Sequence, residues 1–315
     1  MWRALAVLAV VLASCTTLLP ESDDASVSGQ PDARPLAFDG GTQPSPDARP
    51  TGDCPAPPAS ATATTLDAYA RVTELRQIAG LPCASFVDAL DTSSARHSAY
   101  YAANQDDDHC VADPHAEVSG CALFVHPFFA DREVLAGYGG TPSFETMVFG
   151  SAASGANAVQ IWVDSVWHRT PILSPWVRDM GYGDAPGVAT MDFGVGAATS
   201  SSAVATYPAD GQTDVPTSFA GNTEFPTPPV PPEGWPSGYP ITIYMKGTVS
   251  SMVLTRDGDP TPIDSQAFGP NDAAAMGLLD DDYMLYANRP LAGGTLYRVH
   301  AETSRGALDF SFTTR

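Results

Sequence analysis

The sequence predicts an α+β domain followed by an all-β domain, and three observations carry this prediction. Between residues 65 and 180, apolar side chains recur at spacings of three and four, which is typical of helices that bury one face. After residue 207, short alternating segments are separated by turn residues. A chain of 315 residues is long enough for two hydrophobic cores. We therefore expect domains at 61–197 and 207–315, joined by a linker at 198–206.

The first domain is expected to combine helices with at least one strand. The helices are expected at residues 65–78, from near 85 to 104, at 131–136 and after 155, and the strand at 188–193. His97 falls on the buried face of the second helix. A hydrogen-bonded core histidine is a commoner role for such a residue than a ligand, and both remain open.

The second domain is expected to be a β-sandwich. Its strands are predicted at residues 241–245, 252–254, 283–286, 295–299 and 308–312, with Asp257-Gly258 and Gly293-Gly294 as turns. The segment 225–240 is rich in proline and contains Trp235 and Tyr239. Such a segment is either a packed edge loop or a contact patch for a sugar or a protein.

Composition limits the classes of partner. The formal net charge is -21, and Lys246 is the single lysine. A chain without a basic stripe cannot neutralise phosphates, which excludes a nucleic-acid partner and docking by charge on anionic lipid. The acidic runs 106–108 and 280–282 lack the spacing and the glycine of a calcium-binding EF-hand, and are read as solvated turns.

The N-terminus has the pattern of an export signal. Arg3 precedes the apolar run 4–13, which is too short to span a bilayer as a helix. Residues 1–14 are therefore expected to be a signal peptide. Residues 15–60 are rich in proline, repeat Pro-Asp-Ala-Arg-Pro at 31–35 and 46–50, and are expected to form a disordered tether.

The cysteine content agrees with export. Apart from Cys15, the chain has Cys54, Cys83, Cys110 and Cys121, an even number without a zinc-binding spacing. Two disulfides are expected. We favour Cys110 with Cys121 and Cys54 with Cys83, although the sequence leaves the other two pairings open.

Two parts of the sequence resemble known protein families. The residues Leu12-Ala13-Ser14-Cys15 resemble the lipobox of bacterial lipoproteins, which implies a lipid on Cys15 and anchorage to a membrane of the cell envelope. The segments 74–82, 95–104, 136–138 and 162–175 together resemble the CAP superfamily, in particular its bacterial Trp-x-x-Ser-x-x-His-Arg pattern. That family groups cysteine-rich secretory proteins, antigen 5 and pathogenesis-related proteins. The resemblance implies an α-β-α sandwich with a central cleft.

The family resemblance also implies a site built from His and Glu side chains. His168 matches the His of the His-Arg pair, and Glu145 matches the family's Glu, although Phe144 and Thr146 replace its usual Gly and Asn neighbours. His109 is chosen as the first His, with His115 and His126 as rivals. The family's second Glu is missing, because Ser165 stands in its place.

These residues suit several kinds of chemistry. His109, Glu145 and His168 would form a three-ligand site for Zn²⁺. Glu145 and His168 are also the candidate catalytic residues of a metal-assisted hydrolase acting on a peptide or cell-envelope substrate. No nucleophile motif accompanies them, so an enzyme is the less favoured interpretation. The remaining interpretation is a structural pair.

The opening and closing motifs of the second domain, near residues 207–216 and 310–314, resemble bacterial Ig-like domains of surface proteins. The expected function is that of an exported, surface-anchored binding protein whose cleft takes a divalent metal or a small apolar ligand. The alternatives are the hydrolase and an adhesive or structural protein. Lipid, glycan and protein ligands all remain open.

Overall fold

The computed structural model describes residues 15–16, 54–150, 153–195, 203–272 and 281–315. The predicted signal peptide and most of the predicted tether lie outside these residues. Of the predicted tether, the described residues include Cys15–Thr16, which pairs with β3, and Cys54, which forms a disulfide with Cys83. No helix in these ranges is long and apolar enough to cross a bilayer.

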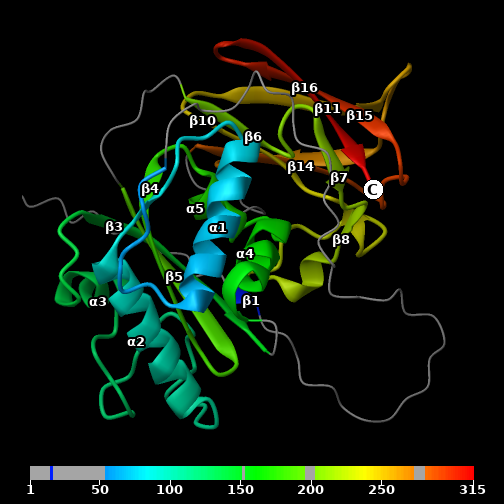
Figure 1. The fold of residues 1–315 in the computed structure, drawn as a ribbon. Coiled ribbons are helices and arrows are strands. Elements are labelled where there is room, and N and C mark those ends of the chain that lie inside the picture. Colours follow the sequence, from blue (N-terminus) through cyan, green and yellow to red (C-terminus); the bar gives the residue numbers. More distant parts are fainter. Residues whose placement is uncertain (1–14, 17–53, 151–152, 196–202, 273–280) are drawn as a thin grey trace, which may run out of the picture.

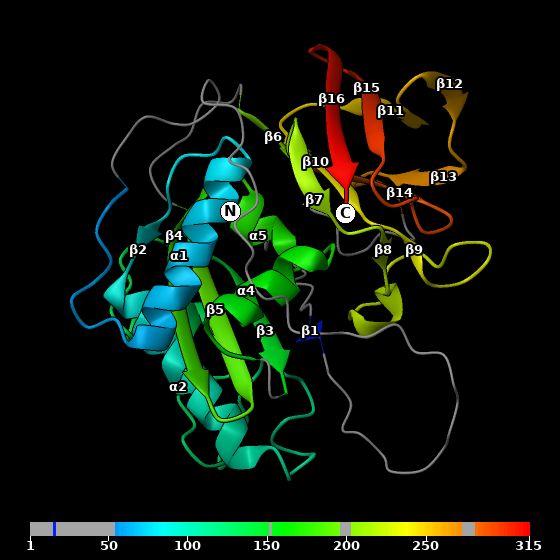
Figure 2. The same cartoon turned by 45° about the vertical axis from the view of Figure 1, so that its right-hand side comes forward.

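The first part of the molecule is built on one five-stranded sheet in the order β1-β3-β5-β4-β2 (Figures 1 and 2). Its strands are β1 (Cys15–Thr16), β2 (Ser85–Phe86), β3 (Thr141–Phe149), β4 (Val177–Ala185) and β5 (Val188–Val195). The three long strands pair antiparallel, and the two short outer strands pair parallel to their neighbours. The predicted strand at 188–193 is confirmed, whereas β3 and β4 were not anticipated.

Helices cover both faces of this sheet (Figures 1 and 2). They are α1 (Ala63–Ile78), α2 (Asp88–Asn104), α3 (Phe129–Leu135), α4 (Gly155–Asp164) and α5 (Arg169–Leu173). A Cβ atom on Gly181 or Gly183 of β4 would lie 2.2 Å from the backbone of α2, so only glycine lets α2 approach. Tyr182 between them points the opposite way and packs on Trp162 of α4. The expected α+β class is confirmed.

Two helix starts differ from expectation for local reasons. Helix α1 begins at Ala63 because Thr62, not Thr65, is the cap: its side chain accepts a hydrogen bond from the backbone N–H of Thr65. Helix α2 begins at Asp88 because Ser85 and Phe86 are extended and pair with β4.

The two expected disulfides are confirmed. Cys54 and Cys83 are joined with a Cα–Cα distance of 5.4 Å, and Cys110 and Cys121 with one of 5.9 Å. The first attaches the chain before α1 to the loop before β2. The second closes part of the long connection between α2 and α3.

The second part consists of β-sheets. Its strands are β6 (Val204–Tyr207), β7 (Gln212–Val215), β8 (Ser218–Phe219), β9 (Ser237–Gly238), β10 (Ile241–Met245), β11 (Val249–Arg256), β12 (Asp259–Pro262), β13 (Ser265–Phe268), β14 (Asp282–Ala287), β15 (Leu296–Thr303) and β16 (Gly306–Thr314). They form a four-stranded sheet (β13-β14-β10-β6), a five-stranded sheet (β12-β11-β15-β16-β7) and the ribbon β8-β9. All five predicted strands are present.

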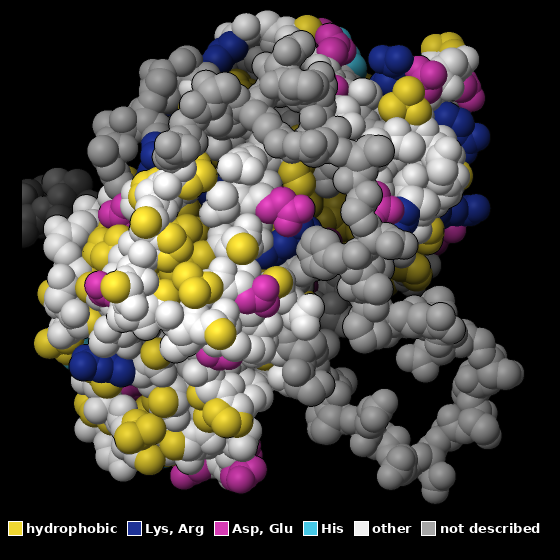
Figure 3. Space-filling model, viewed as in Figure 1, with side chains coloured by type: hydrophobic (Ala, Val, Ile, Leu, Met, Phe, Trp, Pro, Cys, Tyr) yellow, Lys and Arg dark blue, Asp and Glu magenta, His cyan; other side chains and the backbone are white. Residues whose placement is uncertain are grey.

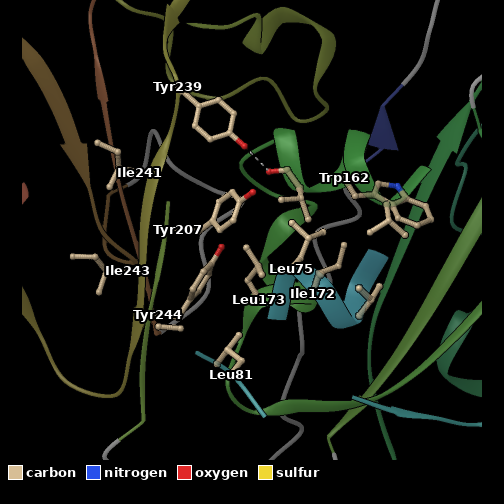
Figure 4. Close-up of a cluster of buried hydrophobic side chains, with 14 of the residues drawn as sticks. Leu75, Leu81, Trp162, Ile172, Leu173, Tyr207, Tyr239, Ile241, Ile243 and Tyr244 are labelled. Atoms are coloured by element: carbon tan, nitrogen blue, oxygen red, sulfur yellow. Dashed lines mark hydrogen bonds between the residues drawn. The ribbon is translucent and has the colours of Figure 1, made fainter. Parts of the chain in front are cut away.

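The two parts share one hydrophobic core (Figure 4). All five residues of β10 are buried, because the strand is covered on both faces. Ile241 and Ile243 point away from the first part, whereas Tyr244 points towards Leu173 of α5. Tyr207 and Tyr239 lie on the same side as Tyr244, so a layer of aromatic rings fills the space between the two parts.

This continuity predicts one cooperative unfolding transition for both parts. Leu173 is fully buried in the shared core, so Leu173→Ala is expected to lower the free energy of unfolding by about 2–5 kcal/mol. Leu66→Ala, on an exposed position of α1, is the matched control and should change it little. Urea unfolding followed by near- and far-ultraviolet circular dichroism measures both. Two separate transitions in the parent protein would contradict the shared core.

Candidate functional site

Five buried, ionisable side chains meet in the first part, and we call them the Glu145 cluster. Its members are His97, His115, Glu117, Arg132 and Glu145. Helix α2 supplies His97, α3 supplies Arg132 and β3 supplies Glu145. The other two come from the α2–α3 connection, which the Cys110–Cys121 disulfide closes. All five are buried.

Arg132 occupies the centre of this cluster. Its Nη2 atom donates to Glu145 Oε2 at 2.6 Å, and its Nε atom lies 3.6 Å from Glu117 Oε1. The same guanidinium donates to the backbone oxygens of His115, His126 and Pro127. Burial alone would raise the pKa of Glu145, but Arg132, His97 and His115 outweigh it and hold that pKa well below its usual range. Glu145 is therefore a fixed anion.

Both imidazoles of the cluster, those of His97 and His115, lie within hydrogen-bond distance of protein oxygens. His97 Nδ1 lies 3.0 Å from Glu117 Oε1, and its Nε2 lies 2.8 Å from the backbone oxygen of Pro114. Each ring nitrogen of His97 therefore has an oxygen of the protein within hydrogen-bond distance. His115 Nδ1 lies 2.8 Å from Glu145 Oε1. The interpretation of His97 as a hydrogen-bonded core residue is confirmed.

Two further acids lie beside the cluster in the core. Glu133 and Asp192 are fully buried. Burial raises the pKa of Glu133 to about 10, and the nearby carboxylates of Asp192 and Glu145 add to that shift. Burial and Glu145 likewise raise the pKa of Asp192 well above its usual range. The neutral form of both acids is therefore favoured, next to an anion and a guanidinium.

The predicted trio of His109, Glu145 and His168 is not formed, which corrects the sequence-based site. His109 is exposed, and its backbone N–H donates to Asp107 Oδ1. Its rival His115 is the histidine that contacts Glu145. His126 is partly exposed and pairs with Asp131. The prediction was wrong because it chose His109 for its position just after a helix. That position does not determine which side chains of the long, disulfide-closed connection between α2 and α3 reach Glu145.

The carboxylates that sequence reasoning missed are Glu117 and Glu224. The first stands two residues after His115, and the sequence His-x-Glu in a disulfide loop was the available signal. Glu224 lies in the second part of the chain, in a Pro-rich stretch that gave no signal.

His168 belongs to a separate buried group that joins the two parts of the molecule, and we call it the Glu224 clamp. Glu224 accepts hydrogen bonds from the backbone N–H groups of Val166 (2.9 Å) and Trp167 (2.6 Å). Its Oε1 atom also lies 3.1 Å from His168 Nδ1. Trp167 Nε1 donates to the backbone oxygen of Pro226 at 2.6 Å. The turn before α5 is thus held by the second part.

The Ser165, His168 and Glu224 side chains do not form a nucleophile–base relay. Ser165 Oγ donates its proton to the backbone oxygen of Trp162. Both Ser165 Oγ and Glu224 Oε1 lie at the same ring atom, His168 Nδ1, at 3.0 and 3.1 Å. A catalytic triad places the nucleophile and the acid on opposite ring nitrogens. All three side chains are also buried.

Arg169 completes the junction between the two parts. Its guanidinium lies 5.1 Å from the ring centroid of Tyr207 and 4.9 Å from that of Tyr239. It donates to the backbone oxygens of Val163, Ser165 and Pro240. The segment 225–240 is accordingly a packed loop where it carries Tyr239, and Trp235 packs between Phe219 and Tyr286.

These residues do not fit the Zn²⁺ ion that the family resemblance suggested. His97 presents no free ring nitrogen, and Arg132 occupies the position between the carboxylates that a cation would take. Consistent with this, no group of three or more His, Cys, Asp or Glu side chains in the described ranges is arranged to hold a metal ion.

Comparisons with known proteins give little further support. No protein-family description matches the chain, and no curated protein sequence matches it. One similar solved structure is an extracellular protein with an SCP domain from Bacillus anthracis strain Ames, at 17% identity and a TM-score of 0.36. The match covers 42% of this chain and 40% of that chain, so this chain spans less than half of its length. The likeness is weak.

The pKa of Glu133 predicts a loss of stability at alkaline pH. An unfolded Glu ionises near pH 4.3, whereas folded Glu133 keeps its proton up to about pH 10, so stability falls as the pH rises through this window. Glu133→Gln removes the effect and should raise the free energy of unfolding at pH 8 by about 1–3 kcal/mol, with little change at pH 4. Urea unfolding at both pH values measures this. Glu74→Gln, exposed on α1, is the control, and equal shifts in both variants would contradict the assignment.

The Glu224 clamp predicts a large effect from a residue outside the first part. Glu224→Ala leaves two buried N–H groups and an imidazole without their acceptor, and should lower the free energy of unfolding by about 3–5 kcal/mol. Limited proteolysis should then cut between the two parts. Glu233→Ala, which breaks an exposed pair with Arg289, should do neither. A Glu224→Ala protein as stable as the parent would exclude the clamp.

Proposed function

We propose that the chain is an exported, CAP-type surface protein that acts by binding a partner through its outer surface, not by catalysis. The observation that carries this proposal is Arg132, which neutralises Glu145 in a closed cluster. A hydrolytic site needs a base that can accept a proton, and a carboxylate fixed by Arg132 and His115 cannot do so readily. The second candidate histidine, His168, is held by the second part of the chain.

Export is supported by two disulfides, which persist in oxidising compartments. The lipid on Cys15 belongs to the same proposal and rests on the sequence pattern of residues 12–15. The CAP-type part of the proposal rests on the resemblance of segments 74–82, 95–104, 136–138 and 162–175 to that family. An adhesive or structural role at the cell surface would use the same outer surface. The shared core joins the two parts into one unit for such a role.

A zinc titration tests the proposal. Isothermal titration calorimetry of the full chain with Zn²⁺ is expected to give no stoichiometric binding, and metal analysis of the purified protein is expected to find none. Glu145→Gln should lower stability, because it removes a charged partner from buried Arg132, without changing either result. Stoichiometric zinc that is lost in His115→Gln and retained in His300→Gln, an exposed histidine, would overturn the proposal.

A further inference from the structure

Helix α3 has its chemical faces reversed. A surface helix normally buries apolar side chains and exposes charged ones. Helix α3 instead buries Arg132 and Glu133 and exposes Val134 and Leu135. The reversal follows from the Glu145 cluster, because Arg132 must point inward to reach Glu145. The apolar side chains of the helix are left in water as a result.

Four strongly exposed apolar residues lie in and just before this helix, and we call them the α3 surface. They are Leu123, Phe128, Val134 and Leu135, with exposed fractions of 60%, 66%, 56% and 60%. Phe128 immediately precedes the helix, and Leu135 is its last residue. Figure 3 shows hydrophobic side chains gathered over the part of the molecule that carries α2 and α3.

The loop before α3 exposes Leu123 in an unfavourable backbone conformation. Leu123 has a φ of 59°, which is uncommon for a residue with a side chain. The loop is also tied down, because Asn104 exchanges hydrogen bonds with the backbone of Ala122, next to the Cys110–Cys121 disulfide. The α3 surface is therefore presented by a rigid frame and does not collapse onto the core.

Exposed charge in the segment that carries the α3 surface is mostly negative. Over residues 95–135 the exposed carboxylates are Asp106, Asp107, Asp108, Asp113 and Asp131. The exposed basic residue of that range is Arg96, because Arg132 is buried. The acidic run follows α2, and the Cys110–Cys121 disulfide brings its loop to the apolar one. Asp and Glu side chains are visible at the lower end of the same side in Figure 3.

We infer that the α3 surface binds a cationic, amphipathic polypeptide segment, whose apolar side chains cover Phe128 and Leu135 and whose Lys or Arg side chains face the surrounding aspartates. The inference rests on the proposed binding function and gives it a site and a partner chemistry. An anionic lipid surface is repelled by these aspartates, and so is a second copy of a chain with a net charge of -21. Apolar contact gives affinity, and opposite charge gives attraction at a distance.

A binding assay with a defined probe tests the inference. The probe is a synthetic amphipathic peptide of Leu and Lys, and fluorescence anisotropy measures its dissociation constant with the full chain at low and high salt. Phe128→Ser combined with Leu135→Ser should weaken binding on the order of tenfold or more. Asp106→Asn, Asp107→Asn and Asp108→Asn together should weaken it and reduce its salt dependence.

The matched control variant is Leu66→Ser combined with Val230→Ser, which removes exposed apolar residues elsewhere and should leave binding unchanged. A peptide of Lys alone should bind more weakly and equally to all variants with intact aspartates. Equal loss in the control and surface variants, or no binding at all, overturns the inference. Two further results would overturn it if the peptide does not bind: binding of phosphatidylcholine vesicles that depends on Phe128 and Leu135, or a dimer in sedimentation experiments that depends on the same residues. Zinc at the Glu145 cluster would overturn the proposed function and not this site.

Discussion

The inward position of the Arg132 guanidinium is the constraint on which the first part of the molecule depends. The guanidinium neutralises Glu145, lies near Glu117 and donates hydrogen bonds to three backbone oxygens, so the long α2–α3 connection folds around it. A buried guanidinium without these acceptors would be strongly destabilising. Satisfying it fixes the rotation of α3 and so turns Val134 and Leu135 outward. The closed cluster of buried charges and the exposed apolar side chains of α3 thus have one cause.

A second buried carboxylate has the corresponding role between the two parts. Glu224 holds the turn that carries His168, and the rings of Tyr207 and Tyr239 cover Arg169. The His-Arg pair therefore faces the second part of the chain and not a ligand cleft. Covering it with protein removes the water access that a reaction or a metal exchange would need. The pair that carried much of the family resemblance is, in the folded molecule, part of an internal interface.

Most of the local structure could be predicted from the sequence. Periodicity located α1, α2 and α4, and alternation located the principal strands of the second part, because both patterns depend only on which neighbours share a face. It missed β3 and β4. Gly181 and Gly183 interrupt the apolar pattern of β4, and they are there because α2 packs closely on that strand. Such a close approach is a tertiary requirement that one strand's composition does not reveal.

The sequence by itself predicted the α+β class of the first part, the β-strands of the second part and Glu145 as a site residue, and it favoured the two disulfide pairs without excluding the other pairings. Only the tertiary structure decided which groups meet. It joined Glu145 to His115 and Arg132, and it paired His168 with a glutamate 56 residues further along the chain. The physical reason is that backbone preferences act over a few residues, whereas the partners of a buried charge are whichever acceptors and donors the packed core brings within hydrogen-bond distance.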